Sequence, residues 1–491
     1  MPFAGVDTFA NRGALESARS ACVRSHATER GGDSPLNLVQ IGAVSLLNAA
    51  GHSRKSGEMN MIPKFVACAA LSMLGCVASR AGAPQPFSED LTLDWDGFRT
   101  ALRDKGFDFH IGYISETATN VRGGDKELWR YADQWTFATT LDLQKLIGVK
   151  DAQFQITITD RNGRNLNNDA KLGSLEEVQE IYGRGQTWHW TEFWYDQQYL
   201  NGMLDWKVGR FSEGNDFAAF SCDFMNLTFC GAAPGNIATS YWYNWPVGPW
   251  GTRLKATFTH FGYVQLGAFE TNPNYLLTRN GLNLGDPGGA TGVVAPVEVG
   301  WLPKFFAALD GSYKFGAWYN SSRAPDAVSN TMGQALALAG GQPLMHNGEY
   351  GAYINFLQRL TVPPIAGSKK GLSAFLNATF VDRRTATIDN QIATGIFYTG
   401  PIPSRPADNI GVAVGRTHVN SRVAAMEALN IAASPDSPGV QHSEYVGEIF
   451  YCIHTADWLE LRPNVQYIHE PGGIAQQKDD VIAGLKLAIN F

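Results

Sequence analysis

Short segments in which apolar and polar residues alternate dominate the chain from residue 107 onward. In residues 153–159, Phe154, Ile156 and Ile158 share one parity, while Gln and Thr residues occupy the other. A period of two places successive side chains on opposite faces of a β-strand. The same pattern recurs at 107–113, 264–268 and 459–467. We therefore predict β-strands, each with one apolar and one polar face.

Turn-forming residues separate these segments, and no long stretch has a convincing helical period. The clearest turn sequences are Asn162-Gly163, Asn201-Gly202, Asp310-Gly311 and Pro471-Gly472-Gly473. A transmembrane strand with its connection takes about 25 residues, so residues 84–491 accommodate about 16 strands. The predicted fold class is therefore all-β, either a large soluble β protein or a transmembrane antiparallel β-barrel.

The end of the chain favours the membrane barrel. Val481, Leu485 and Ile489 lie on the apolar parity of a last strand. That strand ends at Phe491, and Lys486 lies on its polar parity. A final strand ending on an aromatic residue resembles the signature by which the barrel assembly machinery directs barrels into the outer membrane. The edge strand of a soluble domain rarely ends on Phe, so we predict a barrel in contact with outer-membrane lipid.

The composition agrees with such a barrel. Charged residues make up 17% of the 491 residues, below the roughly 25% usual for soluble domains. The mean hydropathy is nevertheless slightly negative, at −0.17. After residue 80, no apolar run approaches the ~20 residues of a membrane helix. The net charge of −7 and the lack of a strong basic patch argue against nucleic acid as a partner.

The region before residue 84 has the features of a secretory signal peptide. A short positive region at 61–64 precedes an apolar stretch at 65–78, and residues 81–83 form an Ala-x-Ala cleavage site. A lipoprotein signal ending at Cys76 is an alternative, although Met73 makes a poor lipobox. A buried core helix at 65–78 is a further alternative.

The first 60 residues are rich in Arg, Ser and Gly and fit neither a signal peptide nor a barrel. We interpret them as the product of an upstream start codon, or as a segment removed with the signal. The predicted parts of the chain are this extension at 1–60, a signal peptide at 61–83 and an outer-membrane β-barrel at 84–491.

Export leaves Cys222, Cys230 and Cys452 in an oxidising compartment. Cys222 and Cys230 lie close together in a loop-like stretch, and we predict a disulfide between them. A metal site is the alternative, but two cysteines without a nearby His or a second pair are too few ligands for structural zinc. We therefore predict no metal site, and we expect Cys452 to be an unpaired strand residue.

Several blocks of sequence carry more information than the alternation. The strongest extends from Glu180 to Trp188, with Tyr-Gly-Arg-Gly-Gln-Thr before the tryptophan, and continues with Phe193-Trp194-Tyr195-Asp196-Gln197. Further blocks are Lys105-Gly106-Phe107-Asp108-Phe109, Asn120-Val121-Arg122-Gly123-Gly124, Arg161-Asn162-Gly163-Arg164-Asn165-Leu166, Val208-Gly209-Arg210-Phe211, Asn226-Leu227-Thr228-Phe229-Cys230-Gly231, Tyr243-Asn244-Trp245-Pro246-Val247 and Arg462-Pro463-Asn464-Val465-Gln466-Tyr467. In these blocks the chain resembles the OprB family of carbohydrate-selective porins. The resemblance extends from residue 87 to 491, with the blocks in the same order as in the family.

The resemblance implies a 16-stranded barrel in the outer membrane of a Gram-negative bacterium, with a homotrimer as the expected assembly. It also implies passive diffusion of glucose and similar small sugars without a cofactor. His189 departs from the family pattern, which often has Arg there, and this difference bears on pore charge and sugar preference. A general porin, or one for a different solute, is the alternative function.

Side-chain parity indicates which polar residues face the lumen of such a barrel. Arg161 continues the polar face of the segment 155–159, and Arg462 shares a polar parity with Asn464. Lys207 is expected to face inward by the same alternation. A sugar in a narrow pore exchanges its hydration for protein donors and acceptors, and must bind weakly enough to leave. We predict these four residues at the constriction, the alternative for each being a wall residue without solute contact.

The segment from Trp188 to Asp196 is harder to orient because it has apolar residues on both parities. Glu192 and Asp196 are candidate hydrogen-bond acceptors for a sugar. Trp194 is a candidate for stacking on a sugar, together with Trp188 and Trp190. An aromatic girdle at the lipid interface is the alternative interpretation of these tryptophans.

The stretch 212–250 is too long for a turn and contains the predicted disulfide. We predict an extracellular loop that folds inward and narrows the pore. A crosslink stabilises such a loop because it reduces the number of alternative conformations.

An enzyme finds little support in the sequence. The chain lacks Gly-x-Ser-x-Gly, His-Glu-x-x-His and P-loop motifs, and its ten histidines are scattered. An outer-membrane enzyme such as a lipase and a secreted sugar-binding β domain are the alternatives from other classes.

Overall fold

The computed structural model describes residues 89–491, except 259–260, 307–308, 365–367 and 434–438. The described residues lie in a unit spanning 68–491. None of the helices in this described part is long and apolar enough to cross a membrane. The predicted extension at 1–60 and the predicted signal peptide at 61–83 lie outside the described residues.

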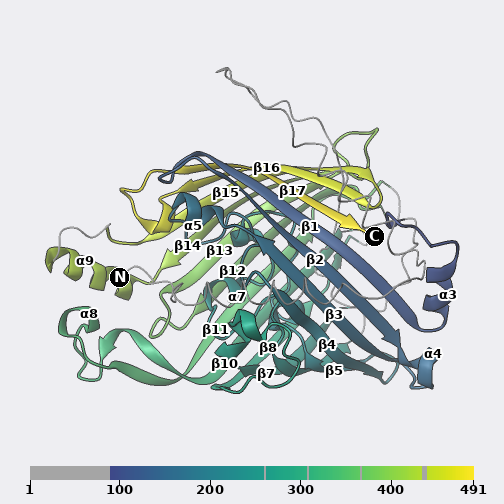
Figure 1. Cartoon of the computed structure of the whole chain (residues 1–491), viewed down its shortest axis with the longest axis horizontal. Helices are drawn as coiled ribbons and strands as arrows, with labels where there is room; N and C mark the ends of the chain where they lie inside the picture. The colour runs from purple at the N-terminus through teal and green to yellow at the C-terminus, as the bar shows by residue number, and fades with distance from the viewer. Residues whose placement is uncertain (1–88, 259–260, 307–308, 365–367, 434–438) are drawn as a thin grey trace, which may run out of the picture. The chain divides into compact units, whose positions relative to one another are not determined.

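The alternating segments form antiparallel strands that close into a ring (Figure 1). Sixteen strands make the ring, because β1 pairs with both β2 and β17, and β8 pairs with β10. They are β1 (Phe107–Arg122), β2 (Trp129–Asp142), β3 (Ala152–Gly163), β4 (Trp188–Tyr199), β5 (Leu204–Arg210), β6 (Trp250–Phe258), β7 (Gly262–Thr271), β8 (Gly292–Trp301), β10 (Leu309–Asn330), β11 (Pro343–Arg359), β12 (Gly371–Val381), β13 (Ile388–Thr399), β14 (Asn409–Val419), β15 (Ser443–Ala456), β16 (Leu459–His469) and β17 (Asp480–Asn490). The two-residue strand β9 (Lys304–Phe305) adds to β10. The predicted all-β fold, an antiparallel barrel of about 16 strands, is confirmed.

The connections divide the barrel into two ends. One end, here called the long-loop end, carries the connections 164–187, 211–249, 272–291 and 420–442. The short-turn end carries tight connections such as 200–203 and 457–458, together with the start of β1 and the end of β17. Such an asymmetry is typical of outer-membrane barrels.

Helices occur only between or before strands in the described part. The α-helices are α3 (Phe98–Asp104), α4 (Leu143–Ile147), α5 (Leu166–Ala170), α6 (Glu213–Asp216), α7 (Ala233–Ile237), α8 (Leu336–Ala339) and α9 (Ser421–Ala433). The 3-10 helices are η2 (Leu227–Phe229), η3 (Pro273–Leu276), η4 (Thr278–Asn280) and η5 (Pro471–Gly473). In Figure 1, α8 and α9 lie at the long-loop end, and α3 and α4 lie at the opposite end.

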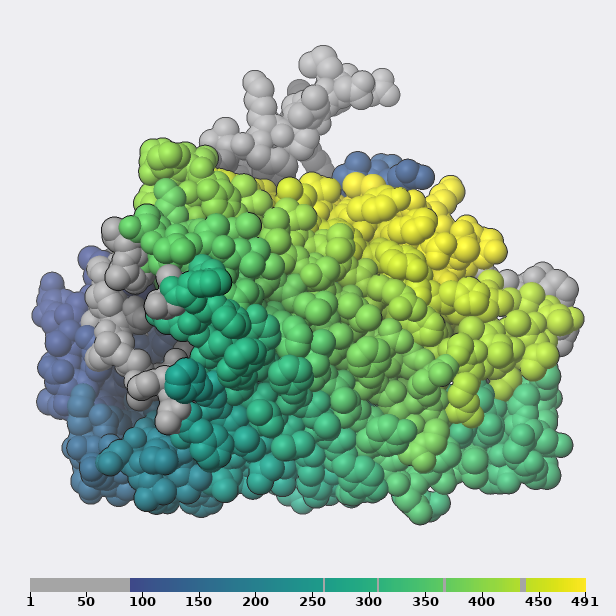
Figure 2. All heavy atoms as spheres, turned by 180° about the vertical axis from the view of Figure 1, so that it is seen from behind, coloured from purple at the N-terminus to yellow at the C-terminus, as the bar shows by residue number. Residues whose placement is uncertain are grey.

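The strands have their apolar face outside and their polar face inside, the reverse of a soluble protein. In β8, Val297 and Val299 are exposed on the outer face, whereas Glu298 between them is fully buried inside. In β16, Val465 points outward and Gln466 is buried inside. Figure 2 shows the outer surface from behind, where the colours change from teal through green to yellow across the wall, in keeping with the strand order. An apolar outside and a polar inside are what a barrel in lipid requires.

The first and last strands of the chain meet at a seam that closes the barrel. Glu116 of β1 is the direct register partner of Lys486 of β17. At the short-turn end, the Arg99 guanidinium donates to the backbone carbonyls of Phe491 (3.1 Å) and Phe109 (3.0 Å), and thereby bridges both strands. The seam thus joins residues at opposite ends of the sequence, as the blue and yellow strands of Figure 1 show.

Candidate functional site

The loop between β5 and β6 (residues 211–249, the β5–β6 loop) runs through the inside of the barrel. Wall side chains hold its backbone carbonyls along the stretch from Asp216 to Phe224. The carbonyls and their donors are Asp216 with Gln265 (2.7 Å), Ala218 with Asn355 (3.1 Å), Ala219 with Lys314, Cys222 with Lys486 (3.0 Å), Asp223 with Arg462 (2.8 Å) and Phe224 with Lys486 (3.3 Å). The donors come from β7, β10, β11, β16 and β17, so the loop is suspended between distant parts of the wall.

Buried glutamates of the wall hold the amide groups of the same loop. The Glu448 carboxylate accepts from the backbone N–H groups of Met225 and Asn226, each at 2.8 Å. The Glu298 carboxylate accepts from the N–H of Ala218 at 2.9 Å and also from wall donors, including the Tyr353 hydroxyl at 2.6 Å. Hydrogen bonds to carboxylates are stronger than those between neutral groups, so these contacts fix the loop backbone.

Aromatic side chains of the β5–β6 loop fill the space between its backbone and the wall. Phe224 is fully buried and lies 4.9 Å from the ring of Phe450 in β15. Trp242 is fully buried and lies 5.0 Å from Trp318 in β10. The wall residue Gly415 leaves room for the loop, since a Cβ there would lie 2.6 Å from the Thr228 methyl group. The loop therefore has its own apolar core inside the lumen.

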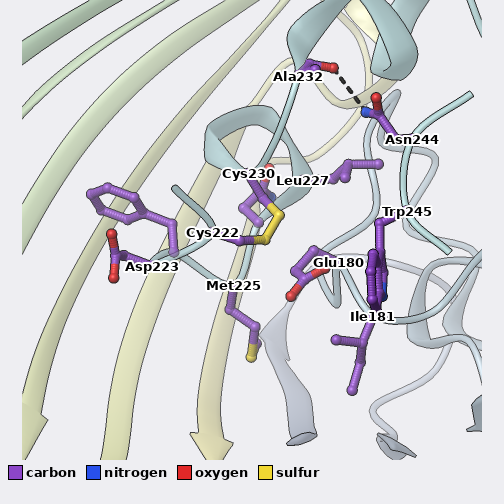
Figure 3. Close-up of a disulfide and its surroundings, with 12 residues drawn as sticks. Glu180, Ile181, Cys222, Asp223, Met225, Leu227, Cys230, Ala232, Asn244 and Trp245 are labelled. Carbon is purple, nitrogen blue, oxygen red and sulfur yellow. Dashed lines mark hydrogen bonds between the residues drawn. A yellow bond between two sulfur atoms is a disulfide. The ribbon is translucent and has the colours of Figure 1, made fainter. Parts of the chain in front are cut away.

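A disulfide joins Cys222 to Cys230 within this loop (Figure 3). Glu180, which belongs to the loop between β3 and β4, lies beside it. Trp245, from the end of the β5–β6 loop, and Ile181, from the loop between β3 and β4, are drawn in the same view. The predicted inward-folding loop and its crosslink are thus both present in the structure.

The loop between β3 and β4 (residues 164–187, the β3–β4 loop) also turns inward, which the sequence patterns did not predict. Its backbone pairs with the β5–β6 loop, with Glu180 N donating to Met225 O (3.0 Å) and Leu227 N donating to Glu177 O (2.9 Å). Arg184 donates to the carbonyl of Gly235 at 2.7 Å. Two loops therefore share the lumen and are joined directly to each other.

The β3–β4 loop carries buried carboxyl groups. Burial raises the pKa of Glu177 to about 7, against which a hydrogen bond from Asn165 acts. Burial, and then the negative charge of Glu444, holds the pKa of Glu176 well above its usual range. Glu176 accepts a hydrogen bond from Gln391 of β13 at 2.7 Å. Glu176 therefore ties the loop to the wall, whereas Glu177 holds Asn165 within the loop itself.

Arg161 lies on the lumen face of β3, where its parity placed it. Its Nε donates to the side-chain oxygen of Gln134 at 2.8 Å, and the indole N–H of Trp245 donates to the same oxygen at 3.0 Å. Its Nη1 donates to the carbonyl of Gly183 at 3.3 Å. The structure therefore brings a guanidinium, an amide and an indole together where both loops meet the wall.

Lys207, Arg462 and Asn464 also face inward, but each contacts the β5–β6 loop. The Lys207 ammonium pairs with Asp216 at 2.9 Å and lies 4.6 Å from the centre of the Trp194 ring. Arg462 pairs with Glu460 at 2.6 Å as well as holding the carbonyl of Asp223. The Asn464 amide donates to Met225 Sδ at 3.4 Å. These three predicted residues hold the loop rather than meeting Arg161.

A β-bulge explains why β4 could not be oriented from its sequence. Thr157 pairs with Glu192 while its neighbour Ile158 pairs with Trp190, so Thr191 is the extra residue. The bulge switches the parity of the strand. As a result, Trp188 is 43% exposed on the outside, whereas Trp194 is 2% exposed on the inside. Trp188 therefore lies on the outer face, where an aromatic girdle would be, whereas Trp194 faces the lumen.

The bulge also turns both predicted acceptors of β4 inward. Glu192 accepts from Thr157 Oγ1 at 2.7 Å and from the Asn215 amide at 3.3 Å. Asp196 lies 3.2 Å from the Arg253 guanidinium of β6 and is buried. Glu192 thus contacts the β5–β6 loop, while Asp196 belongs to an ion pair of the wall.

Two groups of side chains in the described part bring metal-ligating atoms within 4.8 Å of one another. They are Glu180 with Cys222 and Cys230, and Cys452 with His454 and Glu460. The disulfide removes the first pair of thiols as ligands. In the second group, Arg462 already pairs with Glu460, and a guanidinium there opposes a bound cation. Cys452 itself is free and buried in β15.

Comparison with known proteins gives one consistent result. Residues 126–491 match the model of the family described as "Carbohydrate-selective porin, OprB family". The chain is 41% identical to Porin B of Pseudomonas aeruginosa over 432 residues, covering 85% of this chain and 95% of Porin B. The high pH structure of Pseudomonas putida OprB is similar with a TM-score of 0.79 and 41% identity, covering 84% of this chain and 100% of that chain.

Proposed function

Because the chain belongs to the OprB family of carbohydrate-selective porins, we propose that it lets glucose and similar small sugars diffuse passively across the outer membrane of a Gram-negative bacterium. As a member of this family it is a channel and not an enzyme. The observation that carries the proposal is the family match over residues 126–491, together with two loops that narrow the lumen. A narrow pore suits selection among small solutes, because the solute must replace its hydration with wall contacts.

We place solute recognition where Arg161 and Trp245 meet at Gln134. A guanidinium with free donor capacity binds sugar hydroxyls, and an indole offers an apolar surface to the C–H face of a sugar. Glu192 supplies an acceptor on the neighbouring strand. The other predicted residues influence the solute indirectly, because they hold the β5–β6 loop and the wall beside it. They are Lys207, Arg462, Asn464, Asp196 and Trp194.

We further propose a homotrimer whose members contact outer-membrane lipid through the apolar outer face, with the long-loop end outside the cell. Phe491 is the proposed recognition element for the barrel assembly machinery. Its backbone N–H donates to Ile111 O at 2.9 Å, and its ring lies 5.5 Å from Trp135 on the outer face. An aromatic terminus on the lipid side is accessible while the last strand is still pairing with β1.

Liposome swelling tests the recognition site. The wild-type protein is expected to admit glucose faster than an amino acid of similar size, and Arg161→Ala should reduce that preference by about tenfold, the loss of one charged hydrogen bond. Exposed Lys150→Ala at the short-turn end is the matched control and should leave the preference unchanged. Equal rates for both solutes in the wild type would instead support the general-porin alternative.

A further inference from the structure

A buried ammonium lies where the seam of the barrel and both inner loops meet. Lys486 of β17 lies 2.6 Å from Glu180 of the β3–β4 loop and 3.2 Å from Glu116 of β1. It also donates to the carbonyls of Cys222 (3.0 Å) and Phe224 (3.3 Å) in the β5–β6 loop. The ammonium has three N–H donors, and its partners come from three separate parts of the chain, namely β1 and the two inner loops.

The partners of Lys486 are removed from solvent. The side chains of Lys486, Glu116 and Glu180 are 6%, 0% and 9% exposed. Glu116 also accepts from the backbone N–H of Ile181, so the same carboxylate holds the β3–β4 loop. A buried ion pair that loses one member leaves an uncompensated charge, which destabilises its surroundings strongly. Lys486 thus joins both loops to the seam through buried, charged contacts.

Most other contacts between wall and loops involve a single loop. Glu448 and Lys314 hold the β5–β6 loop, whereas Gln391 holds the β3–β4 loop. Gln466 of β16 does contact both, by donating to Val178 O and accepting from the Asn226 amide, each at 2.9 Å. Its contacts are neutral hydrogen bonds, which contribute less than charge-assisted ones. Gln466 is therefore a natural comparison for Lys486.

We propose that Lys486 is a positioning residue of the channel, which couples closure of the β1–β17 seam to the seating of both inner loops. Because Lys486 reaches its site only when the last strand pairs with β1, the constriction is completed by closure of the barrel. The distance between the loops, and with it the pore size and the sugar contacts near Arg161, is then set by a charge in the last strand. The expected effect on sugar passage rests on the proposed function, whereas the expected effect on ion conductance does not.

Single-channel recording in planar bilayers tests the proposal. Lys486→Met is expected to raise the KCl conductance by about twofold or more and to weaken block by glucose by about tenfold. Lys486→Arg, which keeps the charge, should restore most of both properties. Gln466→Leu should change them less than Lys486→Met does. The exposed residue Lys304 of the short strand β9 provides the control, because Lys304→Met should match the wild type.

Heat-modifiable migration in SDS gels shows whether each variant forms a barrel. A folded Lys486→Met channel with wild-type conductance and wild-type glucose block would overturn the proposal. If Lys486→Met does not form a barrel, Glu180→Gln tests the proposal instead, because it leaves the ion pair between Lys486 and Glu116 at the seam intact. Raised conductance in Glu180→Gln supports the proposal, and unchanged conductance overturns it. A wild-type channel that glucose does not block would contradict the proposed function alone, since the conductance comparison still stands.

Discussion

The two loops inside the barrel are held by different kinds of interaction. The β5–β6 loop is fixed by an aromatic core around Phe224 and Trp242 and by a disulfide, in addition to its contacts with wall donors. The β3–β4 loop contributes only aliphatic side chains, such as Leu172 and Val178, to the shared apolar cluster. Its remaining contacts are polar: the buried carboxyl group of Glu176 accepts from the wall, and that of Glu177 accepts from Asn165 within the loop.

This difference predicts that the loops respond to different perturbations. Apolar burial and a covalent crosslink do not titrate, so the aromatic core and the disulfide should keep the β5–β6 loop seated when its ionisable contacts change their protonation. Buried carboxyl groups change their protonation near neutral pH when burial raises their pKa. The β3–β4 loop should therefore be the adjustable member of the pair.

The largest expected effect comes from the aromatic core of the β5–β6 loop. Phe224→Ala should destabilise the seating of this loop by about 3–5 kcal/mol, because it leaves a cavity among several rings. The single-channel conductance should then rise and fluctuate between levels. Phe137→Ala, which removes an outward-facing ring of β2, is the matched control. A steady wild-type conductance in Phe224→Ala would show that the core does not hold the loop.

A smaller effect is expected from the disulfide. Replacing Cys222 and Cys230 by Ser removes a crosslink with a sequence separation of 8, which corresponds to about 2.5 kcal/mol of loop-closure entropy. Limited proteolysis should then cleave within 211–249 more rapidly, while cleavage within 164–187 should change little. Cys452→Ser is the control for loss of a thiol. Equal acceleration in both loops would remove the distinction between them.

The smallest effect is a pH dependence of the β3–β4 loop. Burial raises the pKa of Glu177 from 4.5 to about 7, so its contribution to loop stability is fully present below pH 4.5 and is lost as pH rises through 7. Conductance should therefore increase modestly between pH 5 and pH 8. Glu177→Gln, which stays neutral, should reduce that increase. A pH response that Glu177→Gln leaves intact would assign the effect to another group.

Much of the barrel could be predicted because its faces alternate strictly. The inward orientation of Arg161, Lys207, Arg462 and Asn464 follows from a period of two, which lipid outside and water inside impose on every strand. The bulge at Thr191 appears in the sequence only as apolar residues on both parities, a pattern that does not locate the extra residue, and so the orientation of Glu192 and Asp196 stayed hidden.

Contacts between segments far apart in the chain were beyond the reach of local patterns. The parity of Lys207 indicates its face, but its pairing with Asp216 depends on how the β5–β6 loop folds. The inward turn of the β3–β4 loop has no local apolar signature, since its buried side chains find their partners on β1, β13 and the other loop. Lys486 was visible only as a polar residue in the last strand.

The central claim is that two loops, held by the wall, form the sugar-selective constriction. The most direct measurement is a glucose titration of single-channel conductance for the wild type and for a variant lacking residues 216–236. The wild type should show small steps that glucose blocks at concentrations on the order of millimolar, and the deletion should show larger steps that glucose does not block. Unchanged conductance and unchanged block in a deletion variant that still forms a barrel would contradict the claim.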